Sequence, residues 1–201
     1  KTKLDIGLIK NLKLLVNDNV KDYDFPNINN NANINHIKVM NTWKQWYKLY
    51  VLFSNIHENS IYDFYVRIRP DIEILNDADD LSKIFSMLEK NKLYVPKILM
   101  HDKSIINEFK NYGHINDQFC ICDYRILKVY VDFYNNLKNY GNTMPFISEI
   151  MLYQYLVDCN IQINYIDIEY KLNLTGCNII AITGDSGAGK STLAKCIENL
   201  F

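Results

Sequence analysis

The sequence has no long hydrophobic run. Its longest unbroken apolar stretch, residues 49–53, is five residues long, whereas a helix that crosses a bilayer needs roughly 18 or more. The first ten residues contain no continuous apolar segment either, so we expect neither a membrane span nor a signal peptide. These absences predict a cytoplasmic protein.

An excess of one charge is also missing. The chain carries 22 Lys and Arg against 23 Asp and Glu, which gives a formal net charge of −1, and no block of basic residues stands out. Binding to a nucleic-acid backbone requires a concentrated cationic surface. Nucleic acid is therefore not an expected partner.

Cysteine is scarce and follows no framework spacing. The five cysteines form no Cys-x-x-Cys pair and no ladder of metal ligands, and an odd number without such spacing fits a reducing compartment. Cys120 and Cys122 are two residues apart, so on a strand both thiols would lie on one face. We interpret them as buried, small apolar side chains.

In composition the chain is that of a globular protein with a substantial core, at 48% hydrophobic and 13% aromatic residues. Strands that alternate with helices indicate a layered α/β domain. Apolar spacing predicts helices over residues 41–56, 79–90, 123–139 and 147–159, and strands over 61–69, 93–95, 119–122, 162–168 and 179–182. Asp79 or Asp80 is the expected N-cap of the second of these helices, and Gly141 is the expected stop of the third.

Residues 61–69 give the clearest strand pattern. Strict alternation of this kind is expected of a strand with one buried face. The apolar even positions are Tyr62, Phe64, Val66 and Ile68, and the odd positions are Asp63, Tyr65, Arg67 and Arg69.

The end of this strand carries the chemistry of the larger part of the chain. Arg67 and Arg69 point to one side, and Asp71 and Glu73 follow with the same two-residue spacing. If the chain stays extended, the two carboxylates could share a divalent cation, and a metal-bound diphosphate flanked by arginines is a chemically coherent site. Two plainer alternatives remain: Asp71 as a turn residue after proline, and the arginines as a solvated strand face.

A phosphate-binding motif over residues 184–191 follows the last predicted strand. Its glycines would allow successive backbone N–H groups to point inward and bind an anion at a helix N-terminus. Lys190 would reach the β- and γ-phosphates, and Ser191 would ligate Mg²⁺. Residues 179–182 are the expected buried parallel strand before the loop, and residues 191–201 the helix after it. The alternative is a glycine-rich turn that matches by chance. The segment that fits GxxxxGK[ST] is Gly184-Asp185-Ser186-Gly187-Ala188-Gly189-Lys190-Ser191.

With Thr192 included, this segment resembles the P-loop of small-molecule kinases of the uridine-kinase and adenylylsulfate-kinase type. The resemblance implies a site for ATP with Mg²⁺ over residues 184–192 and a role in phosphoryl transfer, without naming the acceptor. Only residues 191–201 follow Lys190, which leaves no room for a second Mg²⁺ ligand or an acceptor pocket. We therefore expect no kinase activity from this chain alone. A P-loop NTPase coupled to motion is the competing interpretation.

The larger part of the chain resembles glycosyltransferases of the GT-A type, in particular a group with a "YDxxxRxRPD" motif after a Trp/Tyr-rich helix. The resemblance implies that Asp71 and Glu73 hold Mn²⁺ or Mg²⁺ on a nucleotide-sugar diphosphate beside Arg67 and Arg69. It also implies that Asp117 faces the acceptor as a catalytic residue, although an aspartate before a strand is often only a turn cap. The matching segments are residues 62–71, Trp43-Lys44-Gln45-Trp46-Tyr47-Lys48, Asn116-Asp117-Gln118-Phe119, and residues 145–155 with Glu149.

Two domains follow from these patterns, divided at Gly176. We expect residues 1–175 to form a partial, Rossmann-like GT-A domain whose amino-terminal part is missing, and residues 176–201 to begin a P-loop kinase domain. The predicted function is that of a fragment of a bifunctional transferase, with a nucleotide sugar, an unknown acceptor and ATP as partners. The alternative is a non-catalytic interaction domain fused to a P-loop kinase or NTPase.

Overall fold

The computed structural model describes residues 36–54, 62–69, 72–97, 109–172 and 180–183. The P-loop residues 184–192, Asp71 and the proposed boundary at Gly176 lie outside these ranges. The predictions made for them therefore stay predictions.

The described part of the chain contains the predicted alternation of helices and strands, with two further short strands, β2 and β6, that were not predicted from the sequence. The helices are α1 (His36–Ser54), α2 (Ala78–Ser86), α4 (Tyr124–Thr143) and α5 (Ser148–Asp158). The strands are β1 (Tyr65–Ile68), β2 (Ile72–Ile74), β3 (Leu93–Pro96), β4 (Phe119–Cys122), β5 (Ile163–Ile166), β6 (Tyr170–Leu172) and β7 (Ile180–Thr183).

The strands form a mixed sheet and a small separate ribbon. The five-stranded sheet has the order β5-β3-β4-β1-β7. Only β3 and β5 are parallel, and the other neighbours are antiparallel. Strands β2 and β6 pair antiparallel in a two-stranded sheet. The expectation of a layered α/β fold is confirmed at this level, as a mixed α/β protein.

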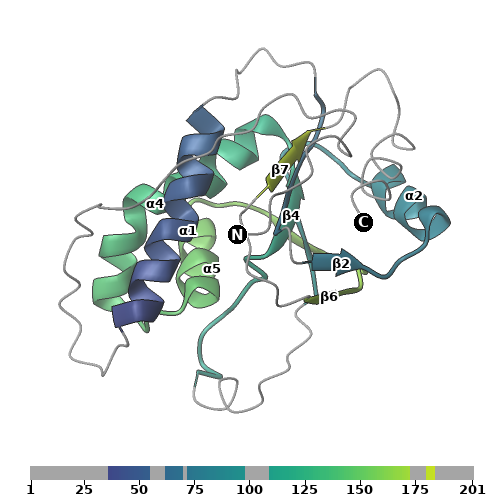
Figure 1. Ribbon diagram of the computed structural model, residues 1–201. Coiled ribbons are helices and arrows are strands. Elements are labelled where there is room, and N and C mark those ends of the chain that lie inside the picture. The colour runs from purple at the N-terminus through teal and green to yellow at the C-terminus, as the bar shows by residue number, and fades with distance from the viewer. Residues whose placement is uncertain (1–35, 55–61, 70–71, 98–108, 173–179, 184–201) are drawn as a thin grey trace, which may run out of the picture.

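Helices cover both faces of the five-stranded sheet. Helices α1, α4 and α5 lie on one face, and α2 lies on the other (Figure 1). Each face has its own hydrophobic core, the first around Trp46, Phe133 and Leu152, and the second around Phe85 and Phe119. Because both faces are covered, all four residues of β1 are buried. The prediction of one polar face on this strand is therefore wrong.

Aromatic packing fixes α1 against α4. The indole of Trp46 is fully buried, with its ring centroid 4.7 Å from that of Phe133 and 5.2 Å from that of Tyr130. Its Nε1 donates a hydrogen bond of 3.0 Å to the hydroxyl of Ser148, at the start of α5. One side chain of α1 thus ties the helical layer together beside the beginning of α5.

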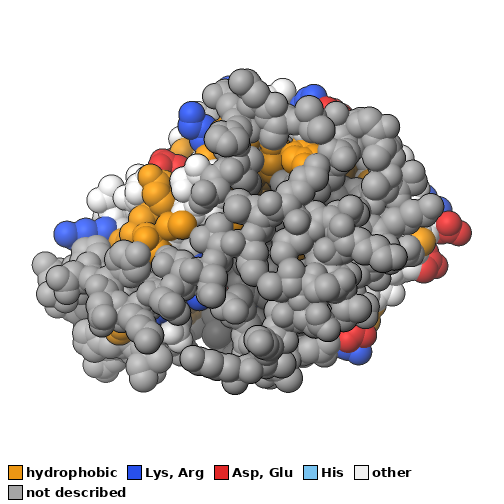
Figure 2. All heavy atoms as spheres, turned by 45° about the horizontal axis from the view of Figure 1, so that its top comes forward, with side chains coloured by type: hydrophobic (Ala, Val, Ile, Leu, Met, Phe, Trp, Pro, Cys, Tyr) orange, Lys and Arg blue, Asp and Glu red, His pale blue; other side chains and the backbone are white. Residues whose placement is uncertain are grey.

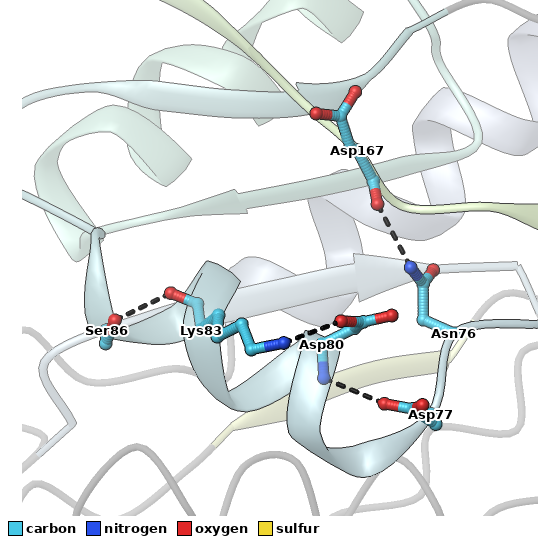
Figure 3. Close-up of polar contacts among 6 residues, drawn as sticks. All are labelled: Asn76, Asp77, Asp80, Lys83, Ser86 and Asp167. Carbon is cyan, nitrogen blue, oxygen red and sulfur yellow. Dashed lines mark hydrogen bonds and ion pairs between the residues drawn. The ribbon is translucent and has the colours of Figure 1, made fainter.

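The N-cap of helix α2 lies two or three residues earlier than expected. Asp77, not Asp79 or Asp80, is the N-cap, and its carboxylate accepts a hydrogen bond of 2.9 Å from the backbone N–H of Asp80 (Figure 3). Just before it, the Asn76 amide donates a hydrogen bond of 3.1 Å to the backbone carbonyl of Asp167. This bond anchors the start of α2 to the segment that follows β5. The tertiary contact of Asn76 and the cap at Asp77 therefore both favour a helix that begins at Ala78.

Helix α4 continues past its predicted end. Its N-cap is Asp123, the residue at which the predicted helix begins, but Gly141 is a buried residue inside the helix and does not stop it. The ring of Tyr140 packs against those of Phe133 and Tyr155, with centroids 6.4 and 5.8 Å apart. Packing of this last turn outweighs the weak helix propensity of glycine, which is about 1 kcal/mol.

The strand before the P-loop belongs to the main sheet. Strand β7 pairs antiparallel with β1, and Ala181 lies opposite Arg67. The expectation of a parallel strand is therefore wrong for β7. Strand β7 occupies the edge of β1 that β4 does not cover.

Some large apolar side chains remain at the surface. They include Met40 and Tyr50 of α1, which are 42% and 37% exposed. Hydrophobic side chains are visible on the helical side of the molecule, between atoms that are not described (Figure 2). No helix within the described ranges is both long and apolar enough to cross a bilayer.

Candidate functional site

Arg67 is a charged side chain inside the core. It lies in the middle of β1, directly opposite Cys120 of β4, and is 1% exposed. Within the described part of the chain, none of its three guanidinium nitrogens has a hydrogen-bond partner. An arginine cannot discharge itself by losing a proton, so such a group is held only with electrostatic support from its surroundings. The solvated strand face that we left open for it is excluded.

Arg69 is the residue that follows β1, two positions after Arg67. It is partly buried, and its backbone N–H donates a hydrogen bond of 3.1 Å to the carbonyl of Gln118. That bond closes the end of β1 onto the segment before β4. The predicted pairing of two arginines on one side of the strand end is thus compatible with the structure.

A rigid turn precedes β4. The side-chain oxygen of Asn116 accepts hydrogen bonds from the backbone N–H groups of Gln118, at 2.8 Å, and Phe119, at 3.2 Å. The Asn116 amide in turn donates to the phenol of Tyr170, which donates to the Gln118 side chain at 3.2 Å. The local asparagine turn and the link to β6 together fix the conformation of residues 116–118.

Asp117 is held within this turn. The residue is 5% exposed, and its carboxylate accepts a hydrogen bond of 3.2 Å from the side-chain amide of Gln45 in α1. The Trp/Tyr-rich helix and the Asn-Asp-Gln-Phe segment, 72 residues apart at this contact, therefore meet at Asp117. The neighbouring Asn116, and not Asp117, makes the turn-capping bonds.

Glu149 lies beside the same turn, in the first turn of α5. Its backbone carbonyl accepts a hydrogen bond of 3.2 Å from the N–H of Ile115. Burial, followed by the negative charge of Asp117, raises the pKa of the Glu149 carboxyl to about 7, although Arg69 and Arg67 oppose the shift. A carboxyl group that is part-protonated near neutral pH is suited to proton transfer or to hydrogen-bond donation.

Arg67, Arg69, Asp117 and Glu149 together form what we call the arginine–carboxylate cluster. Its members come from β1 and the residue after it, from the turn before β4 and from the start of α5, and the charges of the other three shift the pKa of Glu149. The cluster holds two guanidinium and two carboxyl groups, so its formal charge is 0 when Glu149 is ionised and +1 when it is protonated. Its charge therefore changes with one proton.

Neutral phenols and thiols surround the cluster. Burial raises the pKa of Tyr170 on β6, and it raises that of Tyr130 on α4 well above the ordinary value. Burial opposes ionisation of the Cys120 thiol as well, but the hydrogen bond with Cys122 and the charge of Arg67 lower its pKa. Both cysteines are fully buried, as interpreted from the sequence.

Of the two predicted cation ligands, Asp71 lies outside the described residues, and Glu73 is engaged by another partner. Glu73 lies on β2, and its carboxylate forms an ion pair of 2.9 Å with Lys171, opposite it on β6. A carboxylate already engaged by an ammonium group fits a metal ligand poorly, and we derive no step through a metal there. Among the residues that the structure describes, no three His, Cys, Asp or Glu side chains gather as a group that could hold an ion.

Three site residues were not assigned a role from the sequence. Glu149 was noted only within a matching segment, and its signal was a carboxylate in the first turn of a helix after Pro145. Gln45 lay between two tryptophans without a chemical reason of its own. Tyr170 gave no signal, because the predicted strand over residues 162–168 ends before β6 and no element was predicted there.

The chain was compared with known protein families, curated proteins and solved structures. No family model, curated protein or solved structure matches the chain.

Proposed function

We propose that the arginine–carboxylate cluster binds the diphosphate of a nucleotide sugar, and that the chain is part of a transferase that moves the sugar to an acceptor hydroxyl. The single observation that carries this proposal is convergence. The four segments that resemble the glycosyltransferase group are far apart in sequence, yet residues of each meet around Asp117: Gln45, Arg67 and Arg69, Asn116, and Glu149.

The chemistry assigns a role to each side of the cluster. The acceptor oxygen forms a bond to the anomeric carbon, while the bond from that carbon to the diphosphate oxygen breaks and its electron pair leaves with the diphosphate. Arg67 and Arg69 would stabilise the charge of the leaving group. The Asp117 carboxylate, oriented by Gln45, would accept the acceptor's proton.

Asp71 remains the proposed ligand of Mn²⁺ or Mg²⁺. When bound, such an ion would supply charge neutralisation on the diphosphate. Asp71→Ala should abolish sugar transfer while leaving the unfolding transition intact, with Asp63→Ala as a matched control in the same segment. Full transfer by Asp71→Ala would remove the residue from the site.

Release of the nucleoside diphosphate from a panel of nucleotide sugars, with and without Mn²⁺, tests the proposal as a whole. We expect turnover by the chain that is lost in Asp117→Asn and in Arg69→Met, with both variants still folded. The competing interpretation, a non-catalytic interaction domain, predicts no binding of any nucleotide sugar. Equal turnover in the wild type and both variants would contradict the assigned roles.

We also propose that residues 184–192 bind ATP with Mg²⁺, supported by the motif alone. Lys190 supplies a full charge to the terminal phosphates, so Lys190→Ala should remove most of the ATP affinity. Lys195→Ala, in the same segment but outside the motif, is the control. Equal ATP binding by the wild type and Lys190→Ala would refute this part of the proposal.

A further inference from the structure

Two buried side chains hold hydrogen-bond donors that the described part of the chain does not satisfy. Arg67 is 1% exposed, and its Nε, Nη1 and Nη2 have no partner there. Tyr130 of α4 is fully buried, and its hydroxyl has no partner there either. Buried polar groups are nearly always hydrogen-bonded, so exceptions of this kind point to a ligand or to water.

Strand pairing brings these two side chains to the same face of the sheet. Arg67 lies opposite Cys120 of β4, and residues paired in this way across two antiparallel strands share a face. Cys120 and Tyr130 belong to one hydrophobic core, on the side of α1, α4 and α5. The charge of Arg67 also acts on both the Cys120 thiol and the Tyr130 phenol. The guanidinium group therefore lies under the helical layer, in the neighbourhood of Tyr130.

The described residues supply no acceptor for this guanidinium group. The carboxylate of Asp117 accepts its hydrogen bond from Gln45, and no acceptor in the described ranges bonds to a nitrogen of Arg67. The residues beside Arg67 in the sheet, Cys120 and Ala181, both have short side chains. A water molecule would satisfy the donors but leave the buried charge uncompensated, whereas an anion would do both.

We propose that Arg67 and Tyr130 together bind a small monovalent anion of the chloride class, enclosed between the sheet and the helical layer. Arginine offers a permanent charge with several N–H donors, and the phenol adds one O–H donor. Burial raises the pKa of Tyr130 well above its ordinary value, so the hydroxyl keeps its proton. One negative charge matches the one guanidinium group, and the enclosure of both donors favours a compact ion over an extended one.

This inference goes beyond the proposed function, because it requires no nucleotide sugar. If Arg67 also binds the diphosphate, the small anion occupies its position until the sugar donor displaces it. Asp117 and Glu149 belong to the same cluster, and their negative charges oppose an added anion. We therefore expect a weak site, with a Kd for chloride on the order of 10 mM.

A chloride titration at constant ionic strength and fixed pH tests the site. Gluconate is the reference anion, because it carries the same charge and is much larger. The ³⁵Cl NMR signal should show excess line width in the presence of the protein, and bromide should compete this excess away. Urea unfolding should give a folded-to-unfolded ratio about 20-fold higher in roughly 0.2 M chloride than in the same concentration of gluconate.

Variants assign the effect to the two side chains. Arg67→Met should remove both signals, because it deletes the charge and keeps a side chain of similar volume. Tyr130→Phe is nearly isosteric and should weaken chloride affinity about 5- to 10-fold. Two matched controls should keep the wild-type response: Arg125→Met, on the exposed side of α4, and Tyr140→Phe, whose hydroxyl bonds to Asp158.

Equal stability of the wild type in chloride and gluconate, with no excess line width, overturns the proposal and leaves water as the occupant. A chloride response that persists in Arg67→Met overturns it as well, and an unchanged affinity in Tyr130→Phe overturns the part assigned to the phenol.

Addition of UDP-glucose separates this inference from the proposed function. Displacement of chloride by UDP-glucose supports both. Chloride binding without any UDP-glucose binding supports the anion site and contradicts the nucleotide-sugar proposal. UDP-glucose binding without any chloride response overturns the anion site and leaves the nucleotide-sugar proposal standing.

Discussion

Arg67 of β1 lies directly opposite Cys120 of β4, with its guanidinium group enclosed by the helical layer and without a hydrogen-bond partner in the described chain. A buried charge in this state destabilises the fold, and the proposed ligand site would account for its retention. Replacement of buried ionic groups by apolar side chains of similar size is often neutral or stabilising by about 1–4 kcal/mol. Stability and ligand binding should therefore respond in opposite directions here.

Arg67→Met tests this opposition. We expect a free energy of unfolding equal to the wild-type value, or about 1 kcal/mol higher, at pH 6, where a protonated Glu149 leaves little negative charge uncompensated. Binding of UDP-glucose should fall at least about tenfold, because a charge-assisted contact is lost. Arg125→Met, on the exposed side of α4, should change neither quantity. A destabilisation of more than about 2 kcal/mol would show that Arg67 serves the core and not a ligand.

The raised pKa of Glu149 predicts how stability depends on pH. The folded state binds a proton up to about pH 7, whereas the unfolded carboxyl loses it near its ordinary value of 4.5. Folded protein therefore holds more protons between these values, so the free energy of unfolding should fall as the pH rises from about 4.5 to 7 and level off above. The contribution is at most about 3 kcal/mol.

Glu149→Gln removes this contribution. Its free energy of unfolding, relative to that of the wild type, should increase from pH 5 to pH 7.5, as measured by urea unfolding at several pH values. Glu89→Gln, an exposed residue, is the control and should follow the wild-type curve. Parallel curves for wild type and Glu149→Gln would mean that this carboxyl titrates normally.

The cap of α2 gives a purely structural prediction. Asp77→Ala removes the acceptor for the Asp80 backbone N–H and should lower the free energy of unfolding by about 1 kcal/mol. Asp79→Ala, one of the two positions expected from the sequence, should change it by less than about 0.5 kcal/mol. The reverse order of effects would restore the sequence-based assignment.

The sequence predicted elements better than it predicted their partners. Periodicity located α1, α4 and β4, because apolar spacing and caps are local properties of the chain. It could not show that helices cover both faces of β1, so Arg67 was expected to be half-exposed and is buried. Likewise the spacing of Asp71 and Glu73 suggested a shared ion, while the partner of Glu73 is Lys171 on a strand almost a hundred residues later.

Within the site, motif resemblance named candidate residues, and the tertiary fold determined which of their segments meet. Asp117 and the two arginines were named in advance, and their segments do converge. The raised pKa of Glu149 depends on burial and on the charge of Asp117, and neither can be read from the spacing of residues 145–155. Non-local electrostatics is the part that the sequence pattern does not contain.

The last prediction concerns β7. It tests whether β7 is a strand of the main sheet or the start of an independent unit. Strand β1 lies between β4 and β7, and alternate backbone N–H groups of a strand point to opposite neighbours. In a chain that ends after residue 175, about half of the amides of Tyr65–Ile68 should therefore lose protection from hydrogen exchange, while those bonded to β4 stay protected.

Proline variants make the same test within the full chain. Adjacent residues of β7 direct their N–H groups to opposite edges, so only one of Ala181→Pro and Ile182→Pro should remove a bond to β1, and that one alone should expose the same β1 amides. The truncated chain should also associate as its concentration rises, because β1 becomes an unprotected edge. If protection of β1 is the same in the full and truncated chains, β7 does not pair in solution, and the interpretation of residues 176–201 as the beginning of a second domain is favoured.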